Sequence, residues 1–172
     1  MYSIIYGMLV KGLPFERADR IALVYYADPA HEDDQIPLAD FLRYTQQQHT
    51  LSSLGGYFLG SANIAGGEQP ERVTAVRVTG GTLEVTGVRA ILGRTFAPND
   101  NDPAAPPTAV LSYATWRDRF HSDSSIAGKD VRVDGKPYTI IGVMPDGFEF
   151  PRTSVRLWLP IQTATDTLRP GQ

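Results

Sequence analysis

The chain has 172 residues, of which 42% are hydrophobic and 20% are charged, and its net charge at pH 7 is −3. This size and composition are typical of one globular domain with its own core, and the small negative charge argues against binding to a phosphate backbone. Because the sequence contains no cysteine, it excludes disulfide frameworks, thiol catalysis and thiolate metal sites.

The first ten residues, Met1–Val10, are apolar but do not match a membrane helix or a signal peptide. A membrane-spanning helix needs roughly 18–20 consecutive apolar residues, and no run in the sequence reaches that length. The basic start and the small-residue cleavage site of a signal peptide are also missing. Composition alone therefore favours a buried helix over the end of a longer apolar segment.

Two elements are predicted before residue 50. The continuously apolar, β-prone run 20–26 is typical of a strand buried on both faces. Further on, Pro37 suits the first turn of a helix that we expect to end near Gln48. Side chains spaced three and four apart form the apolar face of this helix: Leu38, Phe41, Leu42 and Thr45.

The middle of the chain predicts an antiparallel hairpin. Residues 57–64 are extended, residues 72–79 alternate polar with aliphatic side chains, and Gly66-Gly67 lies between them. Residues 82–88 predict a short helix. Pro, Asn and Asp are frequent in residues 97–107, which we expect to form an exposed and mobile loop.

The C-terminal part predicts further strands, a helix and a second hairpin. Residues 108–111 form a short strand, and Ser112 is a suitable N-cap for a helix with Trp116 on its apolar face. Asp134-Gly135 tolerates positive φ and joins two β-branched runs in a tight turn. Residues 154–160 alternate in polarity and end at a proline, which predicts a last strand. Interspersed strands and short helices with antiparallel pairing indicate an α+β fold.

The sequence holds no recognisable catalytic or metal-binding motif. His31, His49 and His121 are far apart, whereas zinc needs three or four converging ligands, so surface histidines are favoured. The row from Asn99 to Asp102 lacks the alternating spacing of a calcium loop and favours a solvated turn. Neither a nucleophile elbow nor a P-loop occurs. The remaining acid–base candidates are dispersed carboxylates, which are typical of a solubilising surface: Asp40, Glu84, Asp118 and Glu149.

Aromatic residues supply the candidates for binding. Trp116 and Trp158 lie in apolar patterns that are typical of core packing. Phe148 and Phe150 are equally consistent with core packing and with exposure at a partner surface. We therefore take four residues as the candidate surface for a partner or cargo: Phe148, Phe150, Asn99 and Asp100.

Several short motifs follow one another in a specific order over about residues 9–161: Leu13-Pro14-Phe15, Asp19-Arg20-Ile21, Asp40-Phe41, residues 69–73, residues 88–96, residues 109–113 with Trp116 and Phe120, residues 126–129, residues 138–145 and residues 157–160. This order resembles that of the MacB-like periplasmic core domains of ABC transporter permeases. It is similar to the duplicated type within the FtsX and MacB superfamily that has no fused nucleotide-binding domain. Ala90 stands where this family commonly has proline, which removes a rigid turn.

The resemblance implies that residues 1–172 are one extracytoplasmic domain, placed between two helices of the cell inner membrane. On this interpretation residues 1–10 are the end of the first membrane helix, which reverses the preference drawn from composition. The family's architecture implies a porter-like α/β subdomain, residues 11–56 with 108–161, and a small mostly-β inserted subdomain, residues 57–107.

The resemblance also implies a non-catalytic role in coupling ATP-driven motion to efflux or to other extracytoplasmic work. The partners would be the membrane helices of the same chain, a separate ATP-binding subunit and a periplasmic adaptor or outer-membrane protein, with no cofactor and no nucleic acid. Two alternatives remain open: a substrate-capture module for a lipid, lipoprotein or drug, and a regulatory domain that recruits a periplasmic partner. A deep polar cleft with a pair of perturbed pKa values would instead indicate an enzyme.

Overall fold

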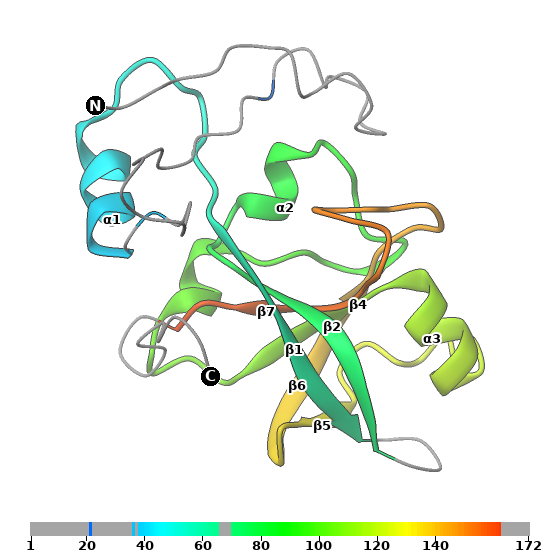
Figure 1. Ribbon diagram of the computed structural model, residues 1–172. Helices are drawn as coiled ribbons and strands as arrows, with labels where there is room; N and C mark the ends of the chain where they lie inside the picture. Colours follow the sequence, from blue (N-terminus) through cyan, green and yellow to red (C-terminus); the bar gives the residue numbers. More distant parts are fainter. Residues whose placement is uncertain (1–20, 22–35, 37, 66–69, 163–172) are drawn as a thin grey trace, which may run out of the picture.

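A computed structural model describes residues 21, 36, 38–65 and 70–162 of the chain (Figure 1). The expected end of a membrane helix, residues 1–10, and nearly all of the expected strand 20–26 lie outside these described residues. Among the described residues, none of the helices has the length and apolar character that crossing a membrane requires.

The elements follow the predicted order closely. They are α1 (Leu38–Gln47), β1 (Tyr57–Ala65), β2 (Glu71–Val78), α2 (Thr82–Val85), β3 (Leu92–Gly93), the 3-10 turn η2 (Pro98–Asn101), β4 (Thr108–Leu111), α3 (Tyr113–Phe120), β5 (Asp130–Val133), β6 (Lys136–Val143) and β7 (Val155–Pro160).

Local turn and cap chemistry agrees with the sequence. Asp134 and Gly135 have φ values of 49° and 79°, so the β5–β6 turn uses the two positive φ angles that a tight hairpin requires. The hydroxyl of Ser112 accepts a hydrogen bond from the Thr115 N–H and caps α3 as predicted. The β1–β2 hairpin pairs antiparallel from Tyr57↔Val78 to Ile64↔Glu71.

Six strands form a closed ring. Around the ring, β1 pairs with β2, β2 with β7, β7 with β4, β4 with β6, β6 with β5, and β5 with β1 again. The β2–β7 and β4–β6 pairs are parallel and the other four are antiparallel, while β3 adds to the edge of β6. The fold is therefore a small β-barrel with peripheral helices, and Figure 1 shows α1 to one side of it and α3 to the other.

The barrel encloses an inner core to which each of the six strands contributes two side chains, because alternate residues of a strand point to opposite faces. Trp116 and Phe120 of α3 pack against this core from one end. The buried members are Ala62, Ile64, Val73, Ala75, Ala109, Leu111, Ile126, Val131, Val133, Ile140, Val143, Leu157 and Leu159.

A second core lies on the outer face of the barrel, under the segments that connect β2 to β4 and β6 to β7. Its buried members are Val76, Val78, Leu83, Phe96, Val110, Met144, Val155 and Trp158. The alternation predicted for the last strand is wrong for this reason, since β7 is buried on both faces from Leu157 to Pro160. Leu157 and Leu159 face the inner core, and Trp158 faces the outer core.

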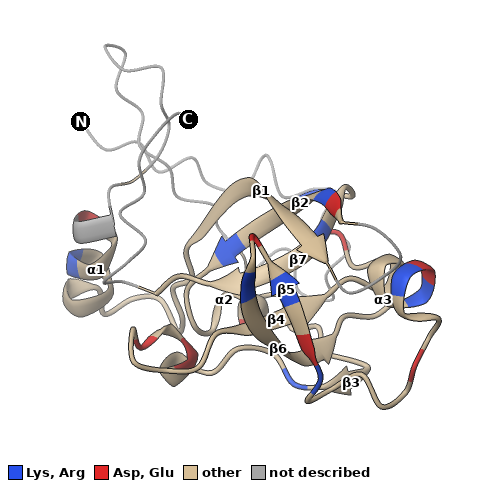
Figure 2. Ribbon diagram, turned by 90° about the horizontal axis from the view of Figure 1, so that it is seen from below, with Lys and Arg blue, Asp and Glu red and all other residues tan. Residues whose placement is uncertain are grey.

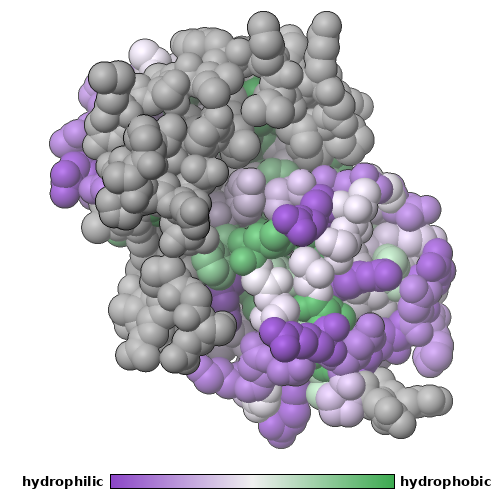
Figure 3. Space-filling view, in the orientation of Figure 1, coloured by the Kyte–Doolittle hydropathy of each residue, from purple (hydrophilic) through white to green (hydrophobic). Residues whose placement is uncertain are grey.

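The expected subdomain boundaries do not coincide with a break in the sheet. Strands β1 and β2, from the expected inserted piece 57–107, pair with β5 and β7 of the expected porter-like part. The sheet and helices agree with an α+β fold, but the division into two subdomains remains a prediction. Figure 2 shows basic and acidic residues interspersed over the barrel and α3, and Figure 3 shows a small hydrophobic area over the first half of β1.

Candidate functional surface

An aromatic cluster lies on the outer core, where the segment after β6 folds back over β7. The ring of Phe148 lies 5.4 Å from that of Trp158, and Phe150 meets Tyr57 edge to face at 5.3 Å between ring centroids. The indole N–H of Trp158 donates to the Phe150 carbonyl at 3.0 Å. We call Tyr57, Phe148, Phe150 and Trp158 the aromatic cluster.

The exposure of this cluster is graded from the interior to the surface. Trp158 is fully buried, as its apolar pattern predicts, Phe148 and Phe150 are half-buried, and Tyr57 is 38% exposed. The two phenylalanines therefore pack on the outer core and still present part of their rings at the surface. An arrangement of this kind can bind an apolar or aromatic partner group, because rings held by packing lose little conformational entropy on binding.

The other two candidate residues, Asn99 and Asp100, lie in η2. Asn99 is exposed, but the solvated, exposed loop expected here is wrong for Asp100, which is only 5% exposed. The Asp100 carboxylate accepts two hydrogen bonds from the Arg94 guanidinium, at 2.6 and 3.0 Å, and one from the Ala97 N–H at 2.7 Å. A tight turn between Arg94 and Asp100 brings them together, and the residue types alone do not show that turn.

These contacts also set the ionisation of Asp100. Burial raises the pKa of the carboxyl, but the hydrogen bonds from Arg94 and Ala97 and the charge of Arg94 outweigh it, so the net pKa lies below its ordinary value. Asp100 is therefore charged at neutral pH and acts as a structural anchor for η2.

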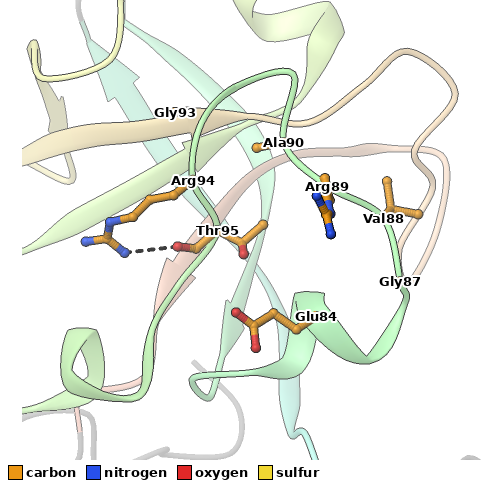
Figure 4. Close-up of a pocket in the computed structure, with 8 residues that line it drawn as sticks. All are labelled: Glu84, Gly87, Val88, Arg89, Ala90, Gly93, Arg94 and Thr95. Atoms are coloured by element: carbon orange, nitrogen blue, oxygen red, sulfur yellow. Dashed lines mark hydrogen bonds between the residues drawn. The ribbon is translucent and has the colours of Figure 1, made fainter.

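A shallow, open hollow of about 500 Å³ lies beside α2 and β3 (Figure 4). Its lining residues are Glu84, Gly87, Val88, Arg89, Ala90, Gly93, Arg94 and Thr95. The side chain of Arg94 extends away from Arg89 and towards Asp100. Its guanidinium also donates a hydrogen bond to the Thr95 carbonyl at 2.9 Å. Of the two arginines in the hollow, Arg89 has a guanidinium that makes no hydrogen bond to any of the described residues. The open shape of the hollow is more typical of a contact surface than of a reaction site.

The residues considered for acid–base or metal chemistry stay apart. Asp40, Glu84 and Asp118 lie on α1, α2 and α3, and Glu149 lies in the segment after β6. His31 lies outside the described residues. Within the described part of the chain, no group of three or more His, Asp or Glu side chains comes close enough to hold a metal ion.

Comparison with known proteins shows which family the chain belongs to. The family model of the MacB-like periplasmic core domain matches residues 1–172. The chain belongs to this family. The resemblance read from the order of motifs is thereby confirmed. The domain is a MacB-like periplasmic core domain.

Two solved structures share the fold at low sequence identity. The periplasmic region of MacB from Actinobacillus actinomycetemcomitans aligns with a TM-score of 0.63 and 17% identity, over 86% of this chain and 67% of that one. The extracellular domain of the noncanonic ABC-type transporter YknZ from Gram-positive bacteria aligns with a TM-score of 0.55 and 19% identity, over 71% of this chain. The alignment spans 61% of the YknZ domain. No curated protein matches the chain.

The motif residues that carry the resemblance are architectural in this structure. Gly93 and Gly142 let β3 and β6 approach, because a Cβ on Gly142 would lie 2.2 Å from the Arg94 carbonyl oxygen. Phe96 is buried in the outer core, and Arg94 anchors Asp100. The motif identifies the family through packing and close backbone approach, and it names no cargo.

Proposed function

We propose that this domain is a non-catalytic, rigid body that transmits ATP-driven movement of the permease to work on the outer side of the membrane. The observation that supports this most directly is the closed ring of six strands around a filled core. In a closed ring each strand is held by neighbours on both sides, so the barrel resists shear better than an open sheet.

The content of the barrel supports a mechanical role over a carrier role. The inner-core side chains are at most 7% exposed and fill the interior, and small barrels filled in this way are packed cores with no internal channel. A body of this kind passes a displacement from one end to the other, as rigid domains do in hinge motions.

The proposal places the domain in a larger machine. Its setting would be the inner membrane, with residues 1–10 as the end of one membrane helix. Its partners would be the membrane helices of the same chain, a separate ATP-binding subunit and a periplasmic adaptor or outer-membrane protein.

Paired spin labels test the proposal. Because the domain has no cysteine, labels can be attached at two introduced cysteines, at the exposed positions Glu84 on α2 and Lys136 on β6. In the full permease with its ATP-binding subunit, we expect the distance between these labels to stay constant between nucleotide states. The distance from Lys136 to a label on a membrane helix should change. A barrel that deforms internally, or that does not move at all, contradicts the proposal.

The aromatic cluster supports a second candidate function, the capture of an apolar cargo. Trp158 packs on Phe148, so binding at Phe148 or Phe150 should change tryptophan fluorescence. Titration with lipid vesicles or with a macrolide would then give a saturating signal that a Phe148→Ala variant weakens. A flat response favours the mechanical role.

A further inference from the structure

The side chain of Asn101 joins the ends of two strands that are more than eighty positions apart in the sequence. Its Nδ2 group donates to the Val78 carbonyl at 3.1 Å and to the Ile161 carbonyl at 2.7 Å. The Val78 carbonyl also accepts the Ile161 N–H at 2.8 Å. Asn101 thus closes the exit of the barrel, where β2 ends and the chain leaves β7.

The strand pairing of β2 with β7 ends at Pro160, so the carbonyl of the next residue, Ile161, lies just beyond the last register pair. Pro160 is the register partner of Val78, and the last ladder bond at this pair runs from the Ile161 N–H to the Val78 carbonyl. The Ile161 carbonyl accepts a hydrogen bond from Asn101, and the Oδ1 atom of Asn101 is buried without a partner among the described residues. The contribution of Asn101 is therefore made through its two N–H donors.

The start of β1 is tied to the same place. The Thr79 N–H donates to the Gly56 carbonyl at 2.9 Å, and the Gly56 N–H donates to the Thr79 hydroxyl at 2.9 Å. Thr82 adds a third hydrogen bond, from its hydroxyl to the Gly56 carbonyl at 3.0 Å. The chain therefore enters the barrel at Gly56, which is bonded to the turn that follows β2, and leaves it at Ile161, which is bonded to Val78 at the end of β2.

The turn that presents Asn101 is itself held firmly. The ion pair between Arg94 and Asp100 fixes η2 to the residue that follows β3, and Gly80 lets η2 approach the end of β2. A Cβ on Gly80 would lie 2.6 Å from the Pro98 Cα atom, so a larger residue would push η2 away.

We propose that Asn101 is a positioning residue that ties the end of β2 to the point where the chain leaves the barrel. A displacement of the segment after Ile161 then moves the whole barrel and does not separate β7 from β2. The role in transmission rests on the proposed function, whereas the tie itself is a local property of the domain.

Hydrogen exchange of the 172-residue chain tests the tie, with Asn101→Ala compared against Asn99→Ala. Asn99 lies in the same turn, is exposed and gives no side-chain hydrogen bond to the described residues, so it is the matched control. Losing the two donors of Asn101 should raise exchange at the Ile161 amide roughly tenfold. Asn99→Ala should stay within about twofold of the unmodified chain. Equal exchange in the two variants overturns the tie.

A milder substitution covers the case in which Asn101→Ala does not fold. Asn101→Ser keeps one hydroxyl donor, so its Ile161 amide should exchange faster than in the unmodified chain but by a smaller factor. Exchange at the unmodified rate in Asn101→Ser would overturn the tie as well.

The spin-label distances in the full permease distinguish the role of Asn101 in transmission from the local tie. If Asn101→Ala reduces the nucleotide-driven movement of Lys136 while ATP hydrolysis continues, the transmission role is supported. If exchange rises but the movement is unchanged, the transmission role is overturned and the proposed function stands. If the barrel of the unmodified protein does not move, the proposed function fails, and the exchange data then bear on the tie alone.

Discussion

Asp100 shows how one carboxylate organises a segment that has little regular structure of its own. Asp100 accepts two hydrogen bonds from the Arg94 guanidinium and one from the Ala97 N–H. These three bonds orient the turn that carries Asn101. Arg94 remains half exposed while Asp100 is buried, so most of the desolvation cost falls on the acid.

Replacing this acid by its amide should destabilise the domain. Asp100→Asn loses the charge-assisted contact with Arg94, and we expect the free energy of unfolding to fall by about 1–2 kcal/mol. Urea unfolding at pH 7 measures the change. Asp118→Asn is the matched control, because the Arg117–Asp118 pair is more than half exposed on both sides and its loss should change the free energy of unfolding far less. Equal losses in the two variants would contradict the role given to Asp100.

The same residue predicts a pH dependence. The folded-state pKa of Asp100 lies below 3.8, the ordinary value, so its contribution to stability is complete above that pH and is lost as the pH falls through the folded pKa. Hydrogen bonds from Lys129 and Ser125 lower the pKa of Asp123 to about 2, which adds in the same direction. Between pH 4 and 2 the stability should decline less steeply in Asp100→Asn than in the unmodified chain. Parallel curves would show that Asp100 does not contribute.

At the scale of the element, α3 links a cap to the barrel. Ser112 caps the helix, and the Thr115 hydroxyl donates to the Arg156 carbonyl on β7 at 2.9 Å. The Ser112 N–H donates to that same carbonyl at 3.1 Å. The start of α3 is therefore fixed to the strand that crosses both cores, which positions Trp116 against the barrel.

Removing the cap tests this link. Ser112→Ala leaves the Thr115 N–H without its partner in a buried position and should cost about 1 kcal/mol of stability. Thermal unfolding followed by circular dichroism gives the change. Ser154→Ala provides the comparison, since this serine is exposed and its side chain makes no hydrogen bond to the described residues, and its unfolding curve should overlay that of the unmodified chain. An unchanged melting temperature in Ser112→Ala would show that the Ser112 cap does not stabilise the domain.

For the whole molecule, the two cores share the same strands. Leu157 and Trp158 are neighbours in β7, yet one belongs to the inner core and the other to the outer core. Neither core can be lost without disturbing the strand that serves both. The sheet also runs through both expected subdomains, so we expect the described barrel to behave as one mechanical unit.

Cooperative unfolding is the corresponding prediction. A Trp116→Phe variant leaves Trp158 as the one remaining tryptophan of the two in the chain, and its fluorescence then reports on the outer core alone. Its urea transition should coincide with the circular dichroism signal of the barrel, as in a two-state domain. Two separated transitions would instead show that the outer core unfolds independently of the barrel.

The local elements and the family could be predicted from the order of residues alone. The Asp134-Gly135 turn, the Ser112 cap and the β1–β2 hairpin each depend on residues close in the chain, whose backbone preferences are written in their types. The order of short glycine, proline and aromatic motifs was enough to indicate MacB-like periplasmic core domains, because those residues set bends and packing.

The closure of the strands into a ring and the role of η2 could not be predicted in this way. The parallel β2–β7 and β4–β6 pairs join segments far apart in the sequence, and no local turn specifies such a pair. Asn99 and Asp100 look alike as polar loop residues, yet one is exposed and the other is buried beside Arg94. The burial of a side chain and its hydrogen-bond partners depend on which distant segments pack beside it, and the identity of a single residue does not determine that.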